Sequence, residues 1–315
     1  MFLARGVALS LSVMVLLYAS LSLVVGWGWR MVERRFRRFS AQVTADFLFG
    51  LRIMPLVLSG LATLVFMVPS FLLLEPHSID EPIGAIPLAL SCCGVLLFVV
   101  GISKATVAQV RTTKVVADWS SEATRAATGA SVPVFRTGKV VPALTAAGIL
   151  KSKVLMSDGA AAVLTESEFR TAIAHEVAHG RRRDNLKKLL FRFCAFPGMA
   201  GLEKGWSEAA EMAADDAAVS NASEALDLAS ALIKLSRFEP VPQSAELTTA
   251  LLHSSAATVS ARVERLIAWD HIHTSTRRFS TWYALLPAFG MVVCAALTYN
   301  AALSQLHLVT EWLVR

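Results

Sequence analysis

Two histidines and a glutamate stand at a spacing that suits a metal site on a helix. His175 and His179 lie four residues apart, and Glu176 follows the first of them, in the pattern His-Glu-x-x-His. On an α-helix, residues i and i+4 lie one above the other, so both imidazoles can reach a single ion. Glu176 is rotated by about 100° from His175, which places its carboxylate beside the ion. This pattern is typical of zinc peptidases, in which the glutamate takes a proton from the water that the metal activates.

The residues around the motif favour a buried helix. Thr165 and Glu168 have the spacing of a capping box, which predicts a helix start at Thr165. Phe169, Ile173 and Val177 can pack inside a protein. Polar side chains in such an apolar stretch need a partner, because burying them unpaired is costly. We therefore predict a Zn²⁺ site here rather than a helix with two chance histidines.

A second helical stretch, Ser207–Asp216, is predicted to supply the third ligand, because catalytic zinc usually has three protein ligands and one open position. Glu211 is the best candidate, and Glu208 competes with it from nearly the same helical face. Asp215, four residues after Glu211, is placed to hydrogen-bond the other nitrogen of a ligating histidine. Alternatively, these acids form a solvated face of an ordinary helix, but the alanines between them favour close packing.

Arg262 lies in a further short helix predicted to start at Ser260. Two roles suit it: stabilising the oxyanion of peptide hydrolysis, or forming a structural salt bridge to one of the acids. We favour the salt bridge. His253, His271 and His273 have no partner at ligand spacing, so we predict that they are surface residues.

Four stretches are long and apolar enough to cross a bilayer, which needs about 20 residues as a helix. They cover approximately residues 6–29, 53–74, 83–103 and 281–303. Hydrophobic residues make up 55% of the chain, which excludes an ordinary soluble domain. We read the first stretch as a retained membrane helix, because arginines follow it where a signal peptide would have a small-residue cleavage site.

The distribution of Lys and Arg predicts how these spans are oriented. Arginines between residues 30 and 38 follow the first span, so that loop should be cytoplasmic. The loop at residues 75–82 has no Lys or Arg and should face outward. Basic residues flank the region 104–278, which places it in the cytoplasm and both termini outside. The net charge of +6 is therefore mostly a topology signal, and we expect no nucleic-acid partner.

Local patterns predict the elements between the spans. Residues 104–130 should continue the third span as a helix, and residues 131–156, rich in Val, Leu and Ile, should form a small sheet. An edge strand of that sheet either binds an extended peptide by strand addition or only supports the metal helix. Residues 222–236 should form another helix. The four cysteines show no disulfide or metal pattern, which suits a reducing cytoplasmic domain.

The two motifs together resemble a known family. The segment His175–Asp184, followed by Glu211–Asp216, is similar to the BlaR/MecR-type integral membrane zinc metallopeptidases. The predicted topology of three spans, a cytoplasmic zinc domain and a fourth span resembles that family as well. Its members transmit a signal across the membrane by cleaving themselves or a cytoplasmic repressor. The given sequence has no segment that resembles their C-terminal penicillin-binding sensor, so we do not expect β-lactam sensing.

The resemblance implies a role for each site residue. His175, His179 and Glu211 would bind zinc, Glu176 would be the catalytic base, and Asp215 would support a ligand. HtpX and Ste24-like peptidases, which share the His-Glu-x-x-His motif and a later Glu-x-x-x-Asp, are the alternative. They imply a role in quality control or processing of membrane proteins.

These inferences together predict a mainly α membrane protein. It would consist of a membrane region with three helices (1–103), a cytoplasmic α+β zincin-like domain with a small sheet (104–278), and a fourth span with a short tail (279–315). Its expected function is a zinc-dependent endopeptidase in regulated proteolysis, with a protein or peptide substrate and the lipid bilayer as partners. A non-catalytic signalling subunit, in which zinc only joins two helices, is the alternative of another class. It would need a fourth protein ligand, and no Cys or His is well placed to serve.

Overall fold

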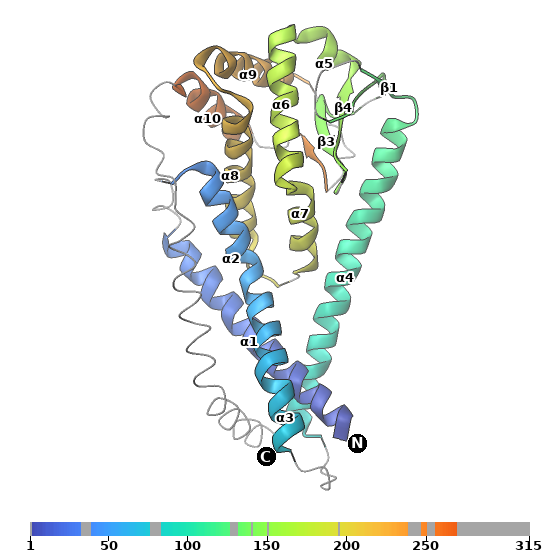
Figure 1. Ribbon diagram of the computed structural model, residues 1–315, viewed down its shortest axis with the longest axis vertical. Coiled ribbons are helices and arrows are strands. Elements are labelled where there is room, and N and C mark those ends of the chain that lie inside the picture. The colour runs from blue at the N-terminus through green and yellow to red at the C-terminus, as the bar shows by residue number, and fades with distance from the viewer. Residues whose placement is uncertain are drawn as a thin grey trace.

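The computed structural model describes residues 2–32, 39–75, 83–126, 132–139, 141–149, 151–194, 196–238, 247–250 and 256–269. The helices of the membrane end are α1 (Phe2–Val32), α2 (Ala41–Ala62), the π-helical turn η2 (Thr63–Met67), α3 (Val68–Leu74) and α4 (Ala85–Ser120) (Figure 1). The remaining helices are α5 (Asp158–Val163), α6 (Glu166–Arg182), α7 (Asp184–Phe193), α8 (Ala200–Ala218), α9 (Ala222–Leu235) and α10 (Ala256–Ile267). The strands are β1 (Thr124–Arg125), β2 (Val134–Thr137), β3 (Leu144–Ala147), β4 (Lys153–Ser157) and β5 (Thr249–Ala250).

Long apolar helices form one end of the molecule (Figure 1). Within the described residues, α1, the continuous helix from α2 to α3, and α4 are each long and apolar enough to cross a bilayer. They contain the first two predicted spans and residues 85–103 of the third, and they indicate a membrane protein. The fourth predicted span, residues 281–303, lies outside the described residues. The second helix begins at Ala41 rather than near residue 53, because Ser40 caps it by accepting a hydrogen bond from the Val43 N–H.

The helix α4 extends from the membrane end to the sheet (Figure 1). It has 36 residues and ends at Ser120, so the predicted continuation beyond residue 103 is confirmed. The prediction of a helix up to residue 130 is wrong, because a turn follows Ser120 and Thr124 enters β1. Val116 and Trp119 of α4 pack with Leu155 of β4, so the helix ends where its apolar face meets the sheet.

The predicted small sheet is present and has five strands in the order β1-β2-β4-β3-β5. Strands β2 and β4 are parallel, and the other neighbours are antiparallel. Successive residues of a strand point to opposite faces. Accordingly, Val154 and Met156 of β4 pack in the core with α6 and α9, whereas Leu155 faces the end of α4. The sheet therefore lies between the helix that carries the histidines and the long helix from the membrane end.

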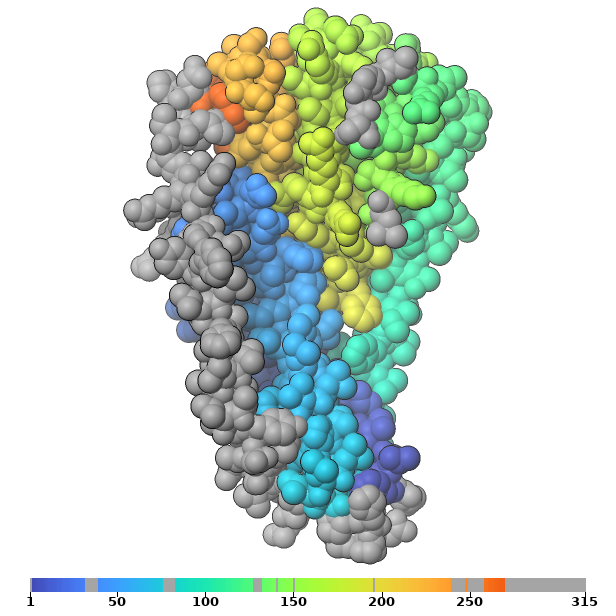
Figure 2. All heavy atoms as spheres, viewed as in Figure 1, coloured from blue at the N-terminus to red at the C-terminus, as the bar shows by residue number. Residues whose placement is uncertain are grey.

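The helix α8 connects the membrane end with the rest of the fold. It begins at Ala200, earlier than the predicted helical stretch Ser207–Asp216, and packs along α2. In the space-filling view, the blue atoms of α2 lie against the yellow atoms of the chain near residues 190–205 (Figure 2). Arg52 of α2 is buried and forms an ion pair of 3.0 Å with Glu203 of α8. The C-terminal half of α8 carries the predicted third ligand, so α8 connects the membrane end with that ligand.

Candidate metal centre

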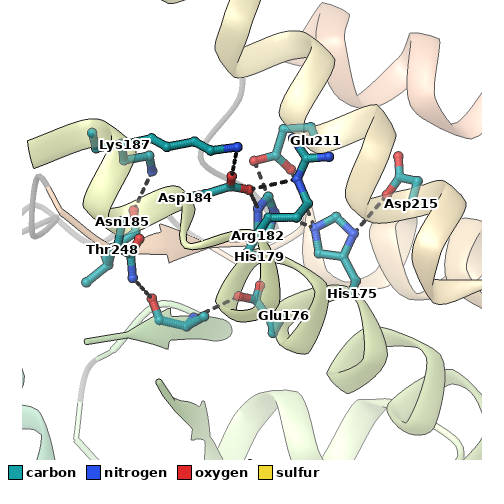
Figure 3. A network of polar contacts seen from close by, with 12 residues as sticks. His175, Glu176, His179, Arg182, Asp184, Asn185, Lys187, Glu211, Asp215 and Thr248 are labelled. Carbon is teal, nitrogen blue, oxygen red and sulfur yellow. Dashed lines mark hydrogen bonds and ion pairs between the residues drawn. The ribbon is translucent and has the colours of Figure 1, made fainter. Parts of the chain in front are cut away.

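Helices α6 and α8 bring three predicted ligands together (Figure 3). His175, His179 and Glu211 are buried, and each offers one ligand atom within 4.8 Å of the others. The two Nε2 atoms are 3.1 Å apart, and each lies 3.6 Å from one carboxylate oxygen of Glu211. Donors bound to one tetrahedral zinc ion at roughly 2.0–2.1 Å lie about 3.3 Å from one another. Two imidazoles and a carboxylate at these separations fit a zinc ion.

Local sequence determines where the metal helix begins. The predicted capping box is confirmed: the Thr165 hydroxyl accepts from the Glu168 N–H, and the Glu168 carboxylate accepts from the Thr165 N–H. Glu168 also forms an ion pair of 2.7 Å with Lys234 of α9. Burial acts to raise the pKa of Glu168, but hydrogen bonds from Lys234, Ser230 and Thr165 outweigh it and lower this pKa to about 2. The cap thus also holds the start of α6 against α9.

A carboxylate lies at the second ring nitrogen of each histidine (Figure 3). The Nδ1 atom of His175 is 3.0 Å from Asp215, and the Nδ1 atom of His179 is 2.7 Å from Asp184. A carboxylate partner at Nδ1 favours the tautomer whose Nε2 lone pair is free to bind a metal. Asp215 therefore lies at the ring nitrogen of His175 that does not face the metal position, as its spacing from Glu211 predicted.

The role of Asp184 was not predicted from the sequence. An aspartate five residues after His179 would point away from it on a continuous helix. Here Arg183 adopts the left-handed conformation (φ 55°, ψ 40°), which ends α6 and starts α7 at Asp184. The chain from Glu166 to Phe193 therefore forms two helices rather than one continuous helix. The Asp184 carboxylate turns back to His179, and this turn depends on the backbone conformation of Arg183, which the side chain of an arginine does not indicate.

Electrostatics in this cluster favour a cation. Burial acts to lower the pKa of His179, but the carboxylates of Glu211 and Asp184 outweigh it and raise this pKa to about 9. Burial acts to raise the pKa of Asp184, but contact with His179 and the charges of Arg182 and Lys187 lower it. A positive charge at the Nε2 atoms is therefore stabilised by the protein around it.

Replacing Asp184 with asparagine should weaken zinc binding by about 10- to 100-fold, because Asp184 orients His179 and increases its basicity. Competition of the purified protein with a chromophoric chelator measures this change. Asp46→Asn is the matched control, because Asp46 contacts the same Lys187 and Arg182 side chains from an exposed position. Equal zinc affinity in Asp184→Asn and Asp46→Asn would contradict the assignment.

Glu176 lies beside the cluster, as its place in the motif predicts (Figure 3). It is fully buried, and its Oε2 atom accepts a hydrogen bond of 2.7 Å from the Ala146 N–H of β3. Its Oε1 atom has no hydrogen-bond partner among the described residues. Burial raises the pKa of Glu176 to about 7. A carboxyl group with this pKa can both accept and donate a proton near neutral pH.

Arg262 of α10 joins the two acids of α8. Its guanidinium donates to both oxygens of Asp215 at 2.8 and 2.6 Å, and it forms an ion pair of 2.9 Å with Glu211. Burial acts to raise the pKa of both acids, but the charge of Arg262 outweighs it. The pKa of Asp215 is lowered to about 2, and that of Glu211 lies well below its usual range. Arg262 therefore forms the structural salt bridge that we favoured from the sequence over a role at the oxyanion.

Arg262→Met should destabilise the protein by about 3–5 kcal/mol, because two buried carboxylates would lose their counter-charge. The loss of stability should be largest in zinc-free protein, where no other cation offsets the charges of the two carboxylates. Thermal unfolding in detergent with and without zinc measures both effects. Arg265→Met is the control, because Arg265 pairs with Asp216 in a less buried position. An equal loss of stability in the two variants would contradict this account.

The remaining candidates do not join the cluster. Glu208 is 3.9 Å from Lys204 on an exposed part of α8, so the structure separates it from the histidines and brings Glu211 to them instead. His253, His271 and His273 lie outside the described residues.

Comparison with known proteins agrees with this geometry. Residues 109–203 match the model of the family described as Peptidase family M48. The matched segment begins in α4 and contains strands β1 to β4, α6 and α7, but it ends before Glu211, Asp215 and β5. No match is found among curated proteins. The similarity indicates a metallopeptidase and covers the two histidines and Glu176.

Proposed function

We propose that this chain is an integral membrane zinc endopeptidase. The observation that carries the proposal is the buried group of His175, His179 and Glu211, with Glu176 beside it. One carboxylate oxygen of Glu176 has no hydrogen-bond partner in the part of the chain that the structure describes. The similarity to Peptidase family M48 supports the same activity. Zinc is the proposed ion because two imidazoles and one carboxylate are a typical ligand set of catalytic zinc.

The mechanism assigns a separate task to each group. Bound zinc supplies polarisation of the scissile carbonyl and activation of a water molecule. Glu176 accepts a proton from the attacking water and later donates it to the leaving amine. The Ala146 N–H holds Oε2 of Glu176, so Oε1 is the atom that carries the proton. Asp184 and Asp215 keep the imidazoles oriented, and Arg262 keeps Glu211 ionised.

The proposed location follows from the apolar helices and the basic residues that flank them. The region 104–278 would lie in the cytoplasm, with both termini outside, in the plasma membrane of a bacterial-type cell. Its substrate would then be a cytoplasmic or membrane-adjacent protein. The BlaR/MecR-like motifs favour regulated proteolysis of a repressor or of the chain itself.

Quality control of membrane proteins, as in HtpX and Ste24-like peptidases, is the alternative within the same chemistry. A purely structural zinc site would need a fourth protein ligand. Among the described residues, the group that could hold an ion has three members, which favours an enzyme over a signalling subunit.

The test pairs two measurements on detergent-purified wild type and Glu176→Gln: bound zinc per chain, and cleavage of casein and of the chain itself. Zinc in both proteins with cleavage only in the wild type would support the proposal. Zinc in both with cleavage in neither would favour the structural alternative. Absence of zinc from both would contradict the metal centre itself.

A further inference from the structure

The edge of β3 that faces away from β4 lies beside the candidate metal centre and contacts Glu176. The Ser157 N–H donates to the Ala143 carbonyl, so residues 143, 145 and 147 direct their backbone groups toward β4. The N–H and C=O of Ala146 therefore point away from β4. Glu176 accepts from this N–H, and the Asn185 side chain donates to this carbonyl at 3.2 Å.

The chain itself supplies a strand on that edge. In β5, Thr249 lies opposite Ala146 and Ala250 lies opposite Thr145. Figure 3 shows Thr248, just before β5, in the same view as Asn185 and Glu176. The side chains of Asn185 and Glu176 both reach the backbone of Ala146 in β3. Residues 247–250, here called the edge segment, thus run beside the candidate catalytic base.

Two side chains from other elements hold the edge segment. Lys188 of α7 donates from Nζ to the Thr248 carbonyl at 2.7 Å. Thr112 of α4 accepts from the Leu247 N–H at 3.3 Å. Leu247 and Thr248 are almost completely buried. The segment is therefore tied to the sheet, to the helix that follows the metal helix, and to a helix from the membrane end.

We propose that the edge segment occupies the place of an extended peptide substrate, and that its bonds to Thr112 and Lys188 keep the peptidase in a restrained state. This rests on the proposed peptidase function. An extended peptide that binds by strand addition needs a free strand edge. One edge of β3 pairs with β4, so a substrate strand and β5 would compete for the other. A pairing of only two residues is short enough for a substrate to displace.

Thr112→Val tests the restraint, because it removes the acceptor of the Leu247 N–H and keeps the shape of the side chain. Cleavage of fluorescent casein by the full-length protein in detergent should rise about two- to tenfold, the effect of losing one hydrogen bond. Thr113→Val is the matched control, because Thr113 is the exposed neighbour on α4 and contacts only Gln109 among the hydrogen bonds described. Its activity should equal that of the wild type.

Each outcome of this assay decides one question. Cleavage that depends on Glu176 but is equal in wild type, Thr112→Val and Thr113→Val would overturn the restraint and leave the peptidase function standing. Cleavage that persists in Glu176→Gln, or is absent from every variant that retains zinc, would overturn the peptidase function and the restraint with it.

A disulfide tests the same proposal in the opposite direction. Thr145→Cys with Ala250→Cys places two thiols directly across β3 and β5, at a separation that suits a disulfide. Oxidation should abolish casein cleavage without loss of zinc, and a reductant should restore it. The two single-cysteine variants, treated in the same way, are the controls. Equal cleavage by the oxidised and reduced forms would overturn the proposal.

Discussion

Glu176→Gln should lower the rate of peptide cleavage by about 10²- to 10⁴-fold, the usual contribution of a general acid–base group. Glutamine has the same shape, and its carbonyl oxygen can still accept the Ala146 N–H that Glu176 accepts at 2.7 Å. It cannot take a proton from water. Bound zinc should stay at the wild-type level, because Glu176 is not among the three residues whose ligand atoms converge.

The measurement is the initial rate of casein cleavage, together with zinc per chain in the same preparation. Glu166→Gln is the matched control, because Glu166 is an exposed carboxylate in the first turn of the same helix. Wild-type rates are expected for that variant. If Glu176→Gln retained more than about a tenth of the wild-type rate, Glu176 would not be the base.

His175→Ala should lose both zinc and activity. Removing this imidazole takes away one of three donors and leaves Asp215 without its 3.0 Å contact at Nδ1. The loss of zinc affinity should exceed the 10- to 100-fold effect expected for an outer partner such as Asp184. Because a ligand that binds only the folded state stabilises it, zinc should raise the unfolding temperature of the wild type but not of the variant.

Chelator-treated wild type is the control for this variant, since it has the same polypeptide without metal. Added zinc should restore both the activity and the unfolding temperature of the treated wild type and neither property of His175→Ala. One zinc ion per chain in purified His175→Ala would contradict the ligand assignment.

The parts of the site that were predicted from sequence depend on helical spacing within one element. His175 and His179 share a face because they are four residues apart, and the same spacing aligns Glu211 with Asp215. A site with two histidines still needs a third ligand, and on this ground we predicted that the helix with Glu211 lies against the helix with the histidines. The structure supplies that juxtaposition, with Nε2 to carboxylate separations of 3.6 Å.

The missed features depend on single backbone conformations or on distant contacts. Asp184 reaches His179 because Arg183 is left-handed, and an arginine gives little indication of that conformation. Arg262 contacts Asp215, which lies 47 residues earlier in the chain. The sequence therefore left two roles possible for Arg262, at the oxyanion or in a salt bridge. The edge segment joins the sheet through pairing with β3, which its own two-residue strand does not reveal.

In the fold, too, local features were predicted from the sequence and long-range contacts were not. Three predicted spans correspond to long helices because hydropathy is a local property of the chain. The existence of a small sheet was predictable from runs of Val, Leu and Ile, but its order was not. Strand β2 pairs in parallel with β4 rather than with β3, the next strand in the sequence, and this pairing depends on long-range contacts that strand composition does not encode.

The length of α4 has a mechanical consequence. A continuous helix of 36 residues is about 54 Å long, whereas the hydrocarbon core of a bilayer is about 30 Å thick. A rigid rod of that length converts a tilt of about 5° at one end into a displacement of about 5 Å at the other, roughly the spacing between neighbouring strands. Helices adjust their tilt to the thickness of the surrounding lipid. A change in the tilt of α4 would therefore be transmitted to the sheet, because Val116 and Trp119 near the end of this helix pack against Leu155 of β4.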